Sequence, residues 1–472
     1  MNVESLTIAE ARRALDAKEY SALELTNAYL DAIREKDGKI HAYLEVWEKT
    51  AHEEAKTADE KIARGEPMPL TGIPLAVKDN ILIEGRIASA ASKMLENYRA
   101  SYDATVIKKL KGQGVIFLGR TNMDEFALGS STENSAYGPT KNPDDTARVP
   151  GGTSGGSTAA VRAGMALGAL GSDTGGSLRQ PAGFCGVVGL KPTYGTVSRF
   201  GLIAAASSLD QIGTVGKTVD DAKILFEAIR GHDGNDSTSL SDSFFDKEPP
   251  LKRRIGVPRA FLKEGIEKDM LVRFEETLRQ LEKAGYSIID VELPSLAYAL
   301  AVYYIINPAE VSTNLARFDG IRYGLSAPAN EVTEVYSKTR VQGFGPETRR
   351  RILVGTFVLS AGYADAYYRK ARAIRELIRD DFVRVHNDVD AVALPISPVP
   401  PWKFGDKADP VAMYAADIFT VPVNLAGVPA ISIPKGTVER EGKSLSVGFQ
   451  LIAPHGGEEA LFSVGCDVEK AL

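Results

Sequence analysis

Residues 149–192 contain two glycine turns that carry hydroxyl groups, and this segment constrains the fold more than any other part of the chain. The first turn spans residues 151–157, and the second spans residues 174–177. Glycines let the backbone come close to a ligand, and consecutive N–H groups in such turns form concavities that bind anions. The apolar run GFCGVVGL follows the second turn, and such a run is not typical of a flexible Gly/Ser linker. The segment therefore predicts a nucleophilic hydroxyl beside an oxyanion hole.

Strand-like and helix-like segments alternate along the rest of the chain. A capping box at Ser21 and Glu24 begins a helix that we expect to end at Gly38. Further helices are expected near residues 103–112, 267–284, 297–318 and 347–384. Strands are expected at residues 72–77, 115–118, 255–257, 287–291 and 391–394, followed by a Val/Ile-rich set at 418–451.

This alternation predicts an α/β fold in which a single large mixed β-sheet carries helices on both faces. Residues 1–65 are expected to form an N-terminal helical layer, and residues 66–472 one compact unit. The polar segment at about 231–250, rich in Asp, Ser and Pro, is the best candidate for an exposed excursion.

Composition narrows the class of protein. The net charge of −6 does not favour direct binding of nucleic acid, so a nucleic-acid substrate would be held by a partner. Two cysteines are too few for a disulfide framework, and we see no His/Cys metal cluster. The N-terminus lacks the apolar core of a signal peptide, and the apolar run at 418–434 is interrupted by Pro422, Asn424 and Pro429. We expect a cytoplasmic protein without a bound metal.

One chemical interpretation of the first turn is a Ser-His-Asp hydrolase, because residues 152–156 match the pattern G-x-S-x-G. That pattern is weak in a run rich in Gly and Ser. It also requires a strand directly before it, whereas residues 142–150 read as a loop. The five histidines lie in segments that do not resemble site loops.

A second interpretation uses Lys78 as the base. Lys78 ends an apolar strand, and burial there lowers the pKa of an ammonium group, which leaves a neutral amine able to accept a proton from a hydroxyl. On spacing alone, a surface lysine at the end of a strand is an equally good interpretation.

Three motifs in order decide between these interpretations: GIPLAVKDN at 72–80, PGGTSGGS at 150–157 and GSDTGGSLRQPA at 171–182. Together they resemble the amidase signature family. The resemblance implies a triad with Ser177 as nucleophile and Lys78 as base. The bridging hydroxyl would belong to Thr153, where the family usually has serine, with Ser154 as the alternative. It also implies that backbone N–H groups of residues 174–177 (Thr174, Gly175, Gly176 and Ser177) hold the oxyanion, and we expect Asp173 to brace the turn.

Five further segments are similar to one branch of this family, the glutaminase subunits of aminoacyl-tRNA amidotransferases: 129–135, 206–213, 303–324, 339–352 and 414–427. That similarity implies glutamine as the amide donor, with Arg351 on its carboxylate and Asp417 on its ammonium group. Arg350 is the alternative to Arg351, and a solvated helix face or an N-cap role are the competing interpretations for Arg351 and Asp417. The remaining substrate-binding residues that it implies are Gly129, Ser130 and Tyr303, with Tyr304 as the alternative to Tyr303.

The same similarity implies partners. The B and C subunits of such an amidotransferase would complete a heterotrimer, in which the second subunit holds the misacylated tRNA and uses ATP and Mg²⁺ to amidate Glu-tRNA(Gln), Asp-tRNA(Asn) or both. This chain would need no cofactor, and it shows no Walker A motif. A stand-alone general amidase and a non-catalytic scaffold, in which Thr153 marks lost activity, are the alternatives.

Overall fold

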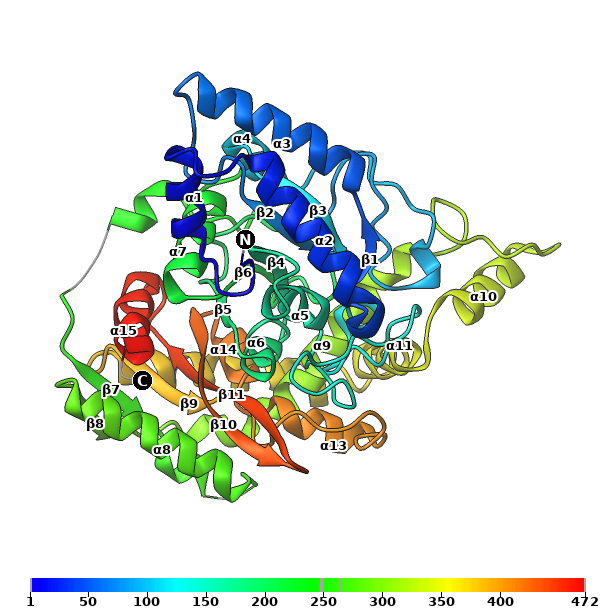
Figure 1. Ribbon diagram of the computed structural model, residues 1–472. Coiled ribbons are helices and arrows are strands. Elements are labelled where there is room, and N and C mark those ends of the chain that lie inside the picture. Colours follow the sequence, from blue (N-terminus) through cyan, green and yellow to red (C-terminus); the bar gives the residue numbers. More distant parts are fainter. Residues whose placement is uncertain (1, 247–249, 264, 471–472) are drawn as a thin grey trace.

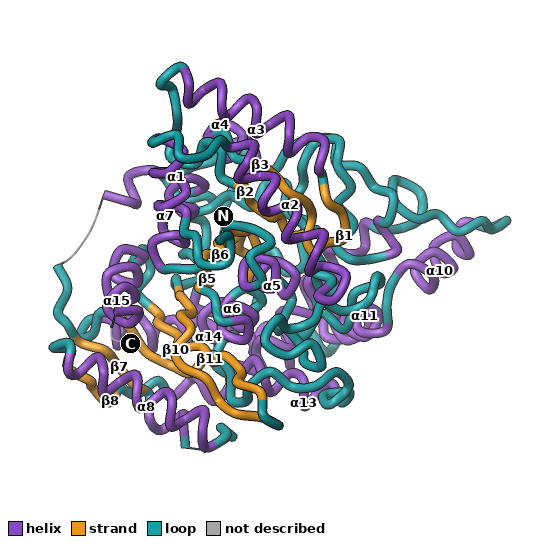
Figure 2. The backbone as a smooth tube through the Cα atoms, in the orientation of Figure 1, coloured by secondary structure: helices purple, strands orange, loops and turns teal. Residues whose placement is uncertain are grey.

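A single mixed β-sheet runs through the molecule (Figure 1). The computed structural model describes residues 2–246, 250–263 and 265–470. Within these residues, the strand order is β1-β3-β2-β4-β6-β5-β10-β11-β9-β7-β8. Figure 2 shows the strands as a continuous layer with helices packed around it. The predicted fold class is confirmed.

The strands of this sheet have the following bounds: β1 (Tyr43–Val46), β2 (Pro74–Lys78), β3 (Ile116–Thr121), β4 (Gly168–Asp173), β5 (Val188–Lys191), β6 (Gln211–Gly216), β7 (Arg254–Val257), β8 (Ser287–Asp290), β9 (Ala391–Pro395), β10 (Ala430–Arg440) and β11 (Lys443–Ile452). The predicted strands near 115–118, 255–257, 287–291 and 391–394 correspond to β3, β7, β8 and β9.

The α-helices have the following bounds: α1 (Ile8–Asp16), α2 (Ala22–Ile40), α3 (Glu48–Ala63), α4 (Thr105–Gln113), α5 (Gly155–Arg162), α6 (Arg179–Cys185), α7 (Val219–Ile229), α8 (Lys268–Lys283), α9 (Ala299–Asn314), α10 (Val332–Gly343), α11 (Pro346–Leu359), α12 (Lys370–His386), α13 (Pro410–Tyr414), α14 (Val421–Ala426) and α15 (Glu458–Lys470). The helix expected over 347–384 is two helices, α11 and α12, which a turn and a short π-helical segment separate. Among the described residues, none of the helices combines the length and the apolar character needed to cross a membrane.

Parallel pairing places three strands in the interior. β2 lies between β3 and β4 and pairs in parallel with both, and every residue of these three strands is buried. Strands buried on both faces read as continuous apolar runs, which is why residues 72–77 were recognisable from sequence. Beyond β4, the strands β6, β5, β10, β11 and β9 pair antiparallel in that order, and β7 then pairs in parallel with β9 and β8.

The N-terminal layer is helical but is not separate from the sheet. The capping box is present, with Ser21 Oγ accepting from the N–H of Glu24 at 3.0 Å. The prediction that α2 ends at Gly38 is wrong: the helix continues to Ile40, because His41 adopts the left-handed conformation that ends it. Residues 43–46 then form β1, an edge strand antiparallel to β3, where only helix was expected.

The polar segment that follows α7 is anchored at its beginning. Asp233 is buried and accepts hydrogen bonds from Thr105 and Ser198, and Asp236 accepts from Arg199. Most other described residues of this segment are exposed or half-buried, as predicted for an excursion. Residues 247–249 lie outside the described residues.

Candidate active site

Two neighbouring parallel strands bring Lys78 and Ser172 together. Lys78 is the last residue of β2, and Ser172 is the fifth residue of β4. Val77 pairs with Leu170 in the register of these strands, so the two polar side chains meet at the carboxyl ends of β2 and β4. Lys78 Nζ donates to Ser172 Oγ at 2.9 Å.

The first glycine turn supplies two more hydroxyl groups to the same lysine. Lys78 Nζ lies 2.6 Å from Thr153 Oγ1 and 2.8 Å from Ser154 Oγ. The peptide bond between Gly152 and Thr153 is cis. The structure thus surrounds the amine with three hydroxyl oxygens, two of which belong to the residues predicted from the sequence.

Burial tunes the lysine for proton transfer. Lys78 is fully buried, and this desolvation lowers its pKa from 10.5 to about 7. The carboxylates of Asp124, Asp173 and Asp210 oppose the shift without cancelling it. A pKa near the working pH is what a general base requires, because the group must both accept and return a proton. The interpretation of Lys78 as a surface lysine is wrong.

Thr153 and Ser154 differ in how their hydroxyl groups are used. Ser154 Oγ donates to Ser172 O at 3.0 Å and accepts from Ser172 N at 3.3 Å, so β4 holds it in place. Among the described residues, Lys78 is the single hydrogen-bond partner of the Thr153 hydroxyl. The Thr153 hydroxyl is therefore the one that remains able to exchange a proton.

The second glycine turn is braced by a buried ion pair. Arg179 Nε donates to Asp173 Oδ2 at 2.9 Å, and both side chains are completely buried. Asp173 Oδ1 also accepts from Gly176 N at 2.9 Å. The expected bracing role of Asp173 is thus present, and it engages the N–H of Gly176, which leaves Thr174, Gly175 and Ser177 as the predicted oxyanion donors. Ser177 follows directly and is 7% exposed.

The C-terminal half of the chain completes this brace. Arg179 also donates to Gln450 of β11, to Asn424 of α14 and to Thr420 O. Thr420 Oγ1 donates to Gly175 O at 2.6 Å. Ser154 N donates to Ser177 O at 2.8 Å, which joins the two glycine turns.

Arg351 is buried in an aromatic and acidic setting. Its side chain is 4% exposed, its Nε donates to Glu347 Oε1 at 2.7 Å, and its Nη1 donates to Asn307 Oδ1 at 3.0 Å. Its guanidinium lies 4.8 Å from the ring centres of both Tyr304 and Tyr414. The interpretation of Arg351 as part of a solvated helix face is wrong, because α11 turns this residue toward α9.

Arg350 precedes Arg351 on the same helix and also contacts Glu347, but it is far more exposed. Its side chain is 45% exposed and pairs with Glu347 from outside. Of the two arginines considered, Arg351 is the one that the structure places among the other predicted site residues.

Asp417 accepts hydrogen bonds from two predicted residues. Ser130 Oγ donates to both of its carboxylate oxygens at 3.0 Å, and Tyr304 Oη donates to Oδ2 at 2.9 Å. The N-cap interpretation is wrong, since this carboxylate faces Ser130 and Tyr304 and not the first N–H groups of α14. Burial raises the pKa of Asp417 to about 7, against the opposing effects of Tyr304, Ser130 and Arg351.

Both tyrosines considered from the sequence lie at the site. The ring of Tyr303 packs so closely on Gly175 that a Cβ there would lie 2.5 Å from its hydroxyl. Tyr304 contacts Arg351 and Asp417 instead. Gly129 precedes Ser130 where the Asp124 carboxylate comes close, and a Cβ at Gly129 would lie 2.4 Å from it.

The histidines do not support the Ser-His-Asp interpretation. Four of the five rings accept from or donate to groups elsewhere: Pro139 O, Asn27, Leu240 O and Ile452 O. The fifth, His455, packs against the ring of Phe244. Ser154 also follows a loop and precedes α5, so the strand that a nucleophile elbow requires does not precede it.

Several residues at the site were missed by the sequence reasoning. These are Asn80, Asp124, Ser172, Asn307, Glu347 and Tyr414. Ser172 gave a usable signal, because a serine inside the apolar strand GALGSD is unusual for a fully buried strand. Asn80, Asn307 and Tyr414 contact the site through pairings that are distant in sequence, whereas Glu347 pairs with Arg351 one turn away on the same helix.

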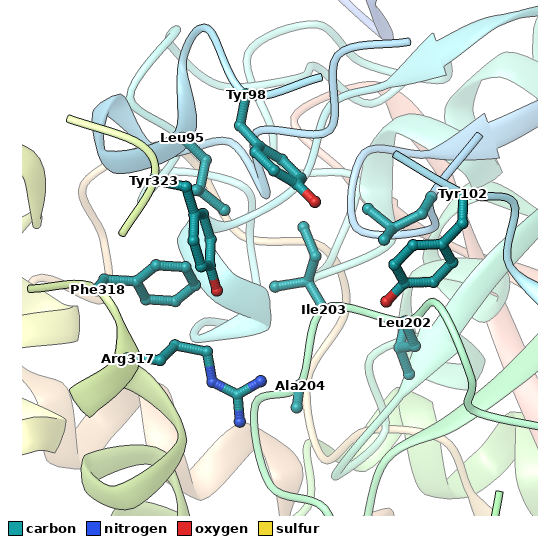
Figure 3. A pocket seen from close by; sticks show the side chains of 10 residues that line it. Leu95, Tyr98, Tyr102, Leu202, Ile203, Ala204, Arg317, Phe318 and Tyr323 are labelled. Carbon is teal, nitrogen blue, oxygen red and sulfur yellow. The ribbon is translucent and has the colours of Figure 1, made fainter. Parts of the chain in front are cut away.

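Of two pockets in the described part of the chain, one includes a residue of the site and the other does not. One of about 430 Å³ adjoins the residues around Arg351 and is lined in part by Glu125, Glu133, Gly345 and Glu347. Figure 3 shows the other, in which the phenol groups of Tyr98, Tyr102 and Tyr323 and the guanidinium of Arg317 surround apolar side chains. None of the predicted site residues lines this second pocket.

Comparison with known proteins identifies the family of this chain. Residues 24–462 match the model of the family described as Amidase. The chain belongs to the amidase family. This amidase is 51% identical to the glutamyl-tRNA(Gln) amidotransferase A subunit of Thermoanaerobacter pseudethanolicus, over 100% of this chain and 97% of that protein. It is 49% identical to the protein of the same name from a Synechococcus strain, over 94% and 88% of the two chains.

Solved structures show the same fold. The crystal structure of the glutamyl-tRNA(Gln) amidotransferase A subunit from Thermotoga maritima matches with a TM-score of 0.81 and 42% identity, covering 100% of this amidase and 95% of that chain. The peptide amidase of Stenotrophomonas maltophilia matches with a TM-score of 0.82 and 27% identity, covering 99% and 97%. The chain is therefore an enzyme of the amidase family, and the family resemblance seen in the three motifs is confirmed.

Proposed function

We propose that this amidase is the glutamine-hydrolysing subunit of a tRNA-dependent amidotransferase. Its full-length similarity to the A subunits of glutamyl-tRNA(Gln) amidotransferases supports the assignment. The proposed reaction is acyl transfer from glutamine to Ser177, followed by hydrolysis of the acyl-enzyme and release of ammonia.

A single observation carries the choice of glutamine. Tyr304 bridges Arg351 and Asp417, since its ring lies under the guanidinium and its hydroxyl donates to the carboxylate. One cation and one anion are thus held close together in a buried site, which matches the carboxylate and ammonium groups of a free amino acid. A general amidase acting on uncharged amides has no use for this pair.

The nucleophile turn adjoins the pair. Asp417 O accepts from Thr420 Oγ1, and the same hydroxyl donates to Gly175 O. Tyr303 of α9 packs on Gly175. An amino acid bound between Arg351 and Asp417 would therefore extend its side-chain amide toward Ser177.

The proton path follows from the contacts of Lys78. Ser177 Oγ bonds to the amide carbon while its proton passes to Thr153 Oγ1, and the proton of Thr153 passes to Lys78 Nζ. The N–H groups of Thr174, Gly175 and Ser177 are the donors proposed for the oxyanion, and one such donor contributes about 10²–10³ in rate. Lys78 then returns the proton through Thr153 to the leaving nitrogen as the C–N bond breaks. Water next attacks the ester and gives its proton through Thr153 to Lys78, and the same relay returns a proton to Ser177 Oγ as the ester bond breaks.

The proposed partners follow from the assignment. Ammonia would pass to the B subunit of the amidotransferase, which holds the misacylated tRNA and uses ATP and Mg²⁺, and the smaller C subunit would complete the heterotrimer. This chain is proposed to bind no cofactor of its own. Its cytoplasmic location stays a prediction, as does the choice between Glu-tRNA(Gln) and Asp-tRNA(Asn).

The test is ammonia release from glutamine by the chain co-purified with its candidate partner subunits. We expect release by the wild type and none by Lys78→Ala or Ser177→Ala. Hydrolysis of aryl or alkyl amides without partners, and not of glutamine, would favour a general amidase. No hydrolysis of either class by the intact complex would favour a scaffold.

A further inference from the structure

The side-chain amide of Asn80 lies beside the partners of Lys78 but outside the proposed triad. Asn80 is 2% exposed, and its Nδ2 donates to Ser172 Oγ at 2.9 Å. In the described part of the chain, its Oδ1 is buried without a hydrogen-bond partner. A buried carbonyl oxygen without a partner is costly, so a state of the site in which Oδ1 is used would recover that cost.

Lys78 changes its hydrogen-bonding needs when it accepts a proton. A neutral amine has two N–H groups and one lone pair, whereas an ammonium has three N–H groups and accepts nothing. The hydroxyl oxygens of Thr153, Ser154 and Ser172 lie 2.6, 2.8 and 2.9 Å from Nζ. Ser172 O lies farther from Nζ, at 3.4 Å, so the ammonium is best paired when all three hydroxyls accept from it.

Each of these hydroxyls must then donate its own hydrogen bond to an acceptor other than Lys78. Ser154 donates to Ser172 O. Thr153 holds the proton that it received from Ser177. Ser172 faces the amide of Asn80, and only the oxygen of that amide can accept a proton.

The two ends of the amide thus suit the two states of the lysine. With Nδ2 toward Ser172, as observed, the amide donates to Ser172 Oγ and offers it no acceptor, which suits a neutral amine whose one lone pair must stay open to the Thr153 proton. A half-turn about the Cβ–Cγ bond places Oδ1 there instead, where it accepts the Ser172 proton and lets Ser172 accept from the ammonium.

We propose that Asn80 is a positioning residue that acts through Ser172 and stabilises the ammonium form of Lys78. The inference rests on the proposed function, because the ammonium forms when Lys78 takes the proton that Ser177 loses. The proton later returns through Thr153, so the Ser172–Asn80 pair gains and loses no proton over the cycle.

Other charged groups also face Lys78 and act independently of Asn80. They are the carboxylates of Asp124, Asp173 and Asp210. Asp124 is held by the N–H groups of residues 131, 132 and 134, Asp173 by Arg179, and Asp210 by Thr174. None of these contacts involves Asn80, so a substitution at residue 80 leaves them in place.

The test is the pH dependence of the rate at which a fluorophosphonate labels Ser177, measured on the full-length chain. Labelling needs the base but neither glutamine nor partners. The acid limb is the pH range in which the labelling rate falls as Lys78 becomes protonated. In Asn80→Leu, loss of one hydrogen bond that supports the ammonium moves this limb to lower pH by about 0.5–1 unit. Ser172→Ala gives the same direction of shift, and adding Asn80→Leu to Ser172→Ala gives no further shift.

Asn80→Asp should shift the acid limb of the labelling rate in the opposite direction. A carboxylate in the same place stabilises the ammonium more strongly and moves the limb to higher pH. This isosteric variant and Ser172→Ala carry the test if Asn80→Leu does not fold. An equal loss of rate at every pH, with the limb unmoved, would show a packing role only and overturn the inference. Wild-type protein that is labelled no faster than Ser177→Ala would overturn the proposed function, and the inference with it.

Discussion

Thr153 keeps the hydroxyl that the proton relay needs and adds a methyl group to it. Its Oγ1 lies 2.6 Å from Lys78 Nζ, so the branched side chain fits beside the base. We expect Thr153→Ser to retain kcat/KM for glutamine within a few-fold. Thr153→Val, which keeps the shape and removes the hydroxyl, should lose about 10²–10⁴ in kcat/KM. An active Thr153→Val enzyme would move the relay to Ser154.

Arg351 and Arg350 form a matched pair for testing how glutamine is held. Replacing Arg351 with methionine removes the proposed buried, charge-assisted contact to the substrate carboxylate, which should raise the KM for glutamine by about 10–100-fold. Arg350→Met removes an exposed side chain and should leave KM near the wild-type value. Steady-state kinetics of ammonia release compares the two. Equal KM values would place the carboxylate elsewhere.

The pKa of Lys78, about 7, sets the acid limb of the reaction. The amine accepts a proton only when neutral, so labelling of Ser177 should fall about tenfold per pH unit below pH 7 and level off above it. The pKa of Asp417 is also about 7, and its carboxylate is the proposed contact of the substrate ammonium. The KM for glutamine should therefore rise at acid pH, whereas fluorophosphonate labelling reports Lys78 alone. A labelling rate that is flat from pH 5 to 8 would contradict the role of Lys78.

At the scale of single elements, the turn between β4 and α6 depends on one buried ion pair. Truncating Arg179 to alanine leaves Asp173 charged and buried, and we expect a loss of about 3–5 kcal/mol in the free energy of unfolding. The exposed pair of Arg369 and Asp365 is the control, where Arg369→Ala should change stability by less than about 1 kcal/mol. Denaturant unfolding measures both. Equal effects would show that Arg179 is not the brace of the turn.

For the molecule as a whole, the N-terminal layer and the sheet are expected to fold together. β1 covers the edge of β3, and Gly72 packs on Leu15, Ala22 and Ala58 of the first three helices. A chain of residues 66–472 would expose that edge and part of the core, so we expect it to aggregate where the full-length chain is monodisperse in size-exclusion chromatography. A fragment that stays monodisperse and unfolds cooperatively would show that the layer is an independent domain.

Local patterns predicted the elements whose boundaries depend on nearby residues. The amphipathic segment 267–284 is α8 (Lys268–Lys283), and the apolar run 391–394 is β9 (Ala391–Pro395). β1 was missed because its four residues gain their stability from β3, more than 70 residues later. The end of α2 was missed because a histidine took the conformation that glycine usually takes.

The same distinction applies to the site. Lys78, Thr153 and Ser177 lie in compact motifs, which is why the sequence reveals them. The setting of Arg351 is only partly visible in the sequence: Glu347 lies one turn away on the same helix, but Asn307 of α9 and Tyr414 of α13 become neighbours only in the fold. Whether Ser172 and Asn80 matter could be judged only once β2 and β4 were seen to be neighbours.

The brace around Arg179 has a consequence for synthesis of the protein. The nucleophile and its base leave the ribosome early, but Thr420, Asn424 and Gln450, which hold Arg179, emerge near the end of translation. A nascent chain halted before residue 420 would carry Lys78, Thr153 and Ser177 and still lack the groups that order the nucleophile turn. Activity should therefore appear only when synthesis is almost complete.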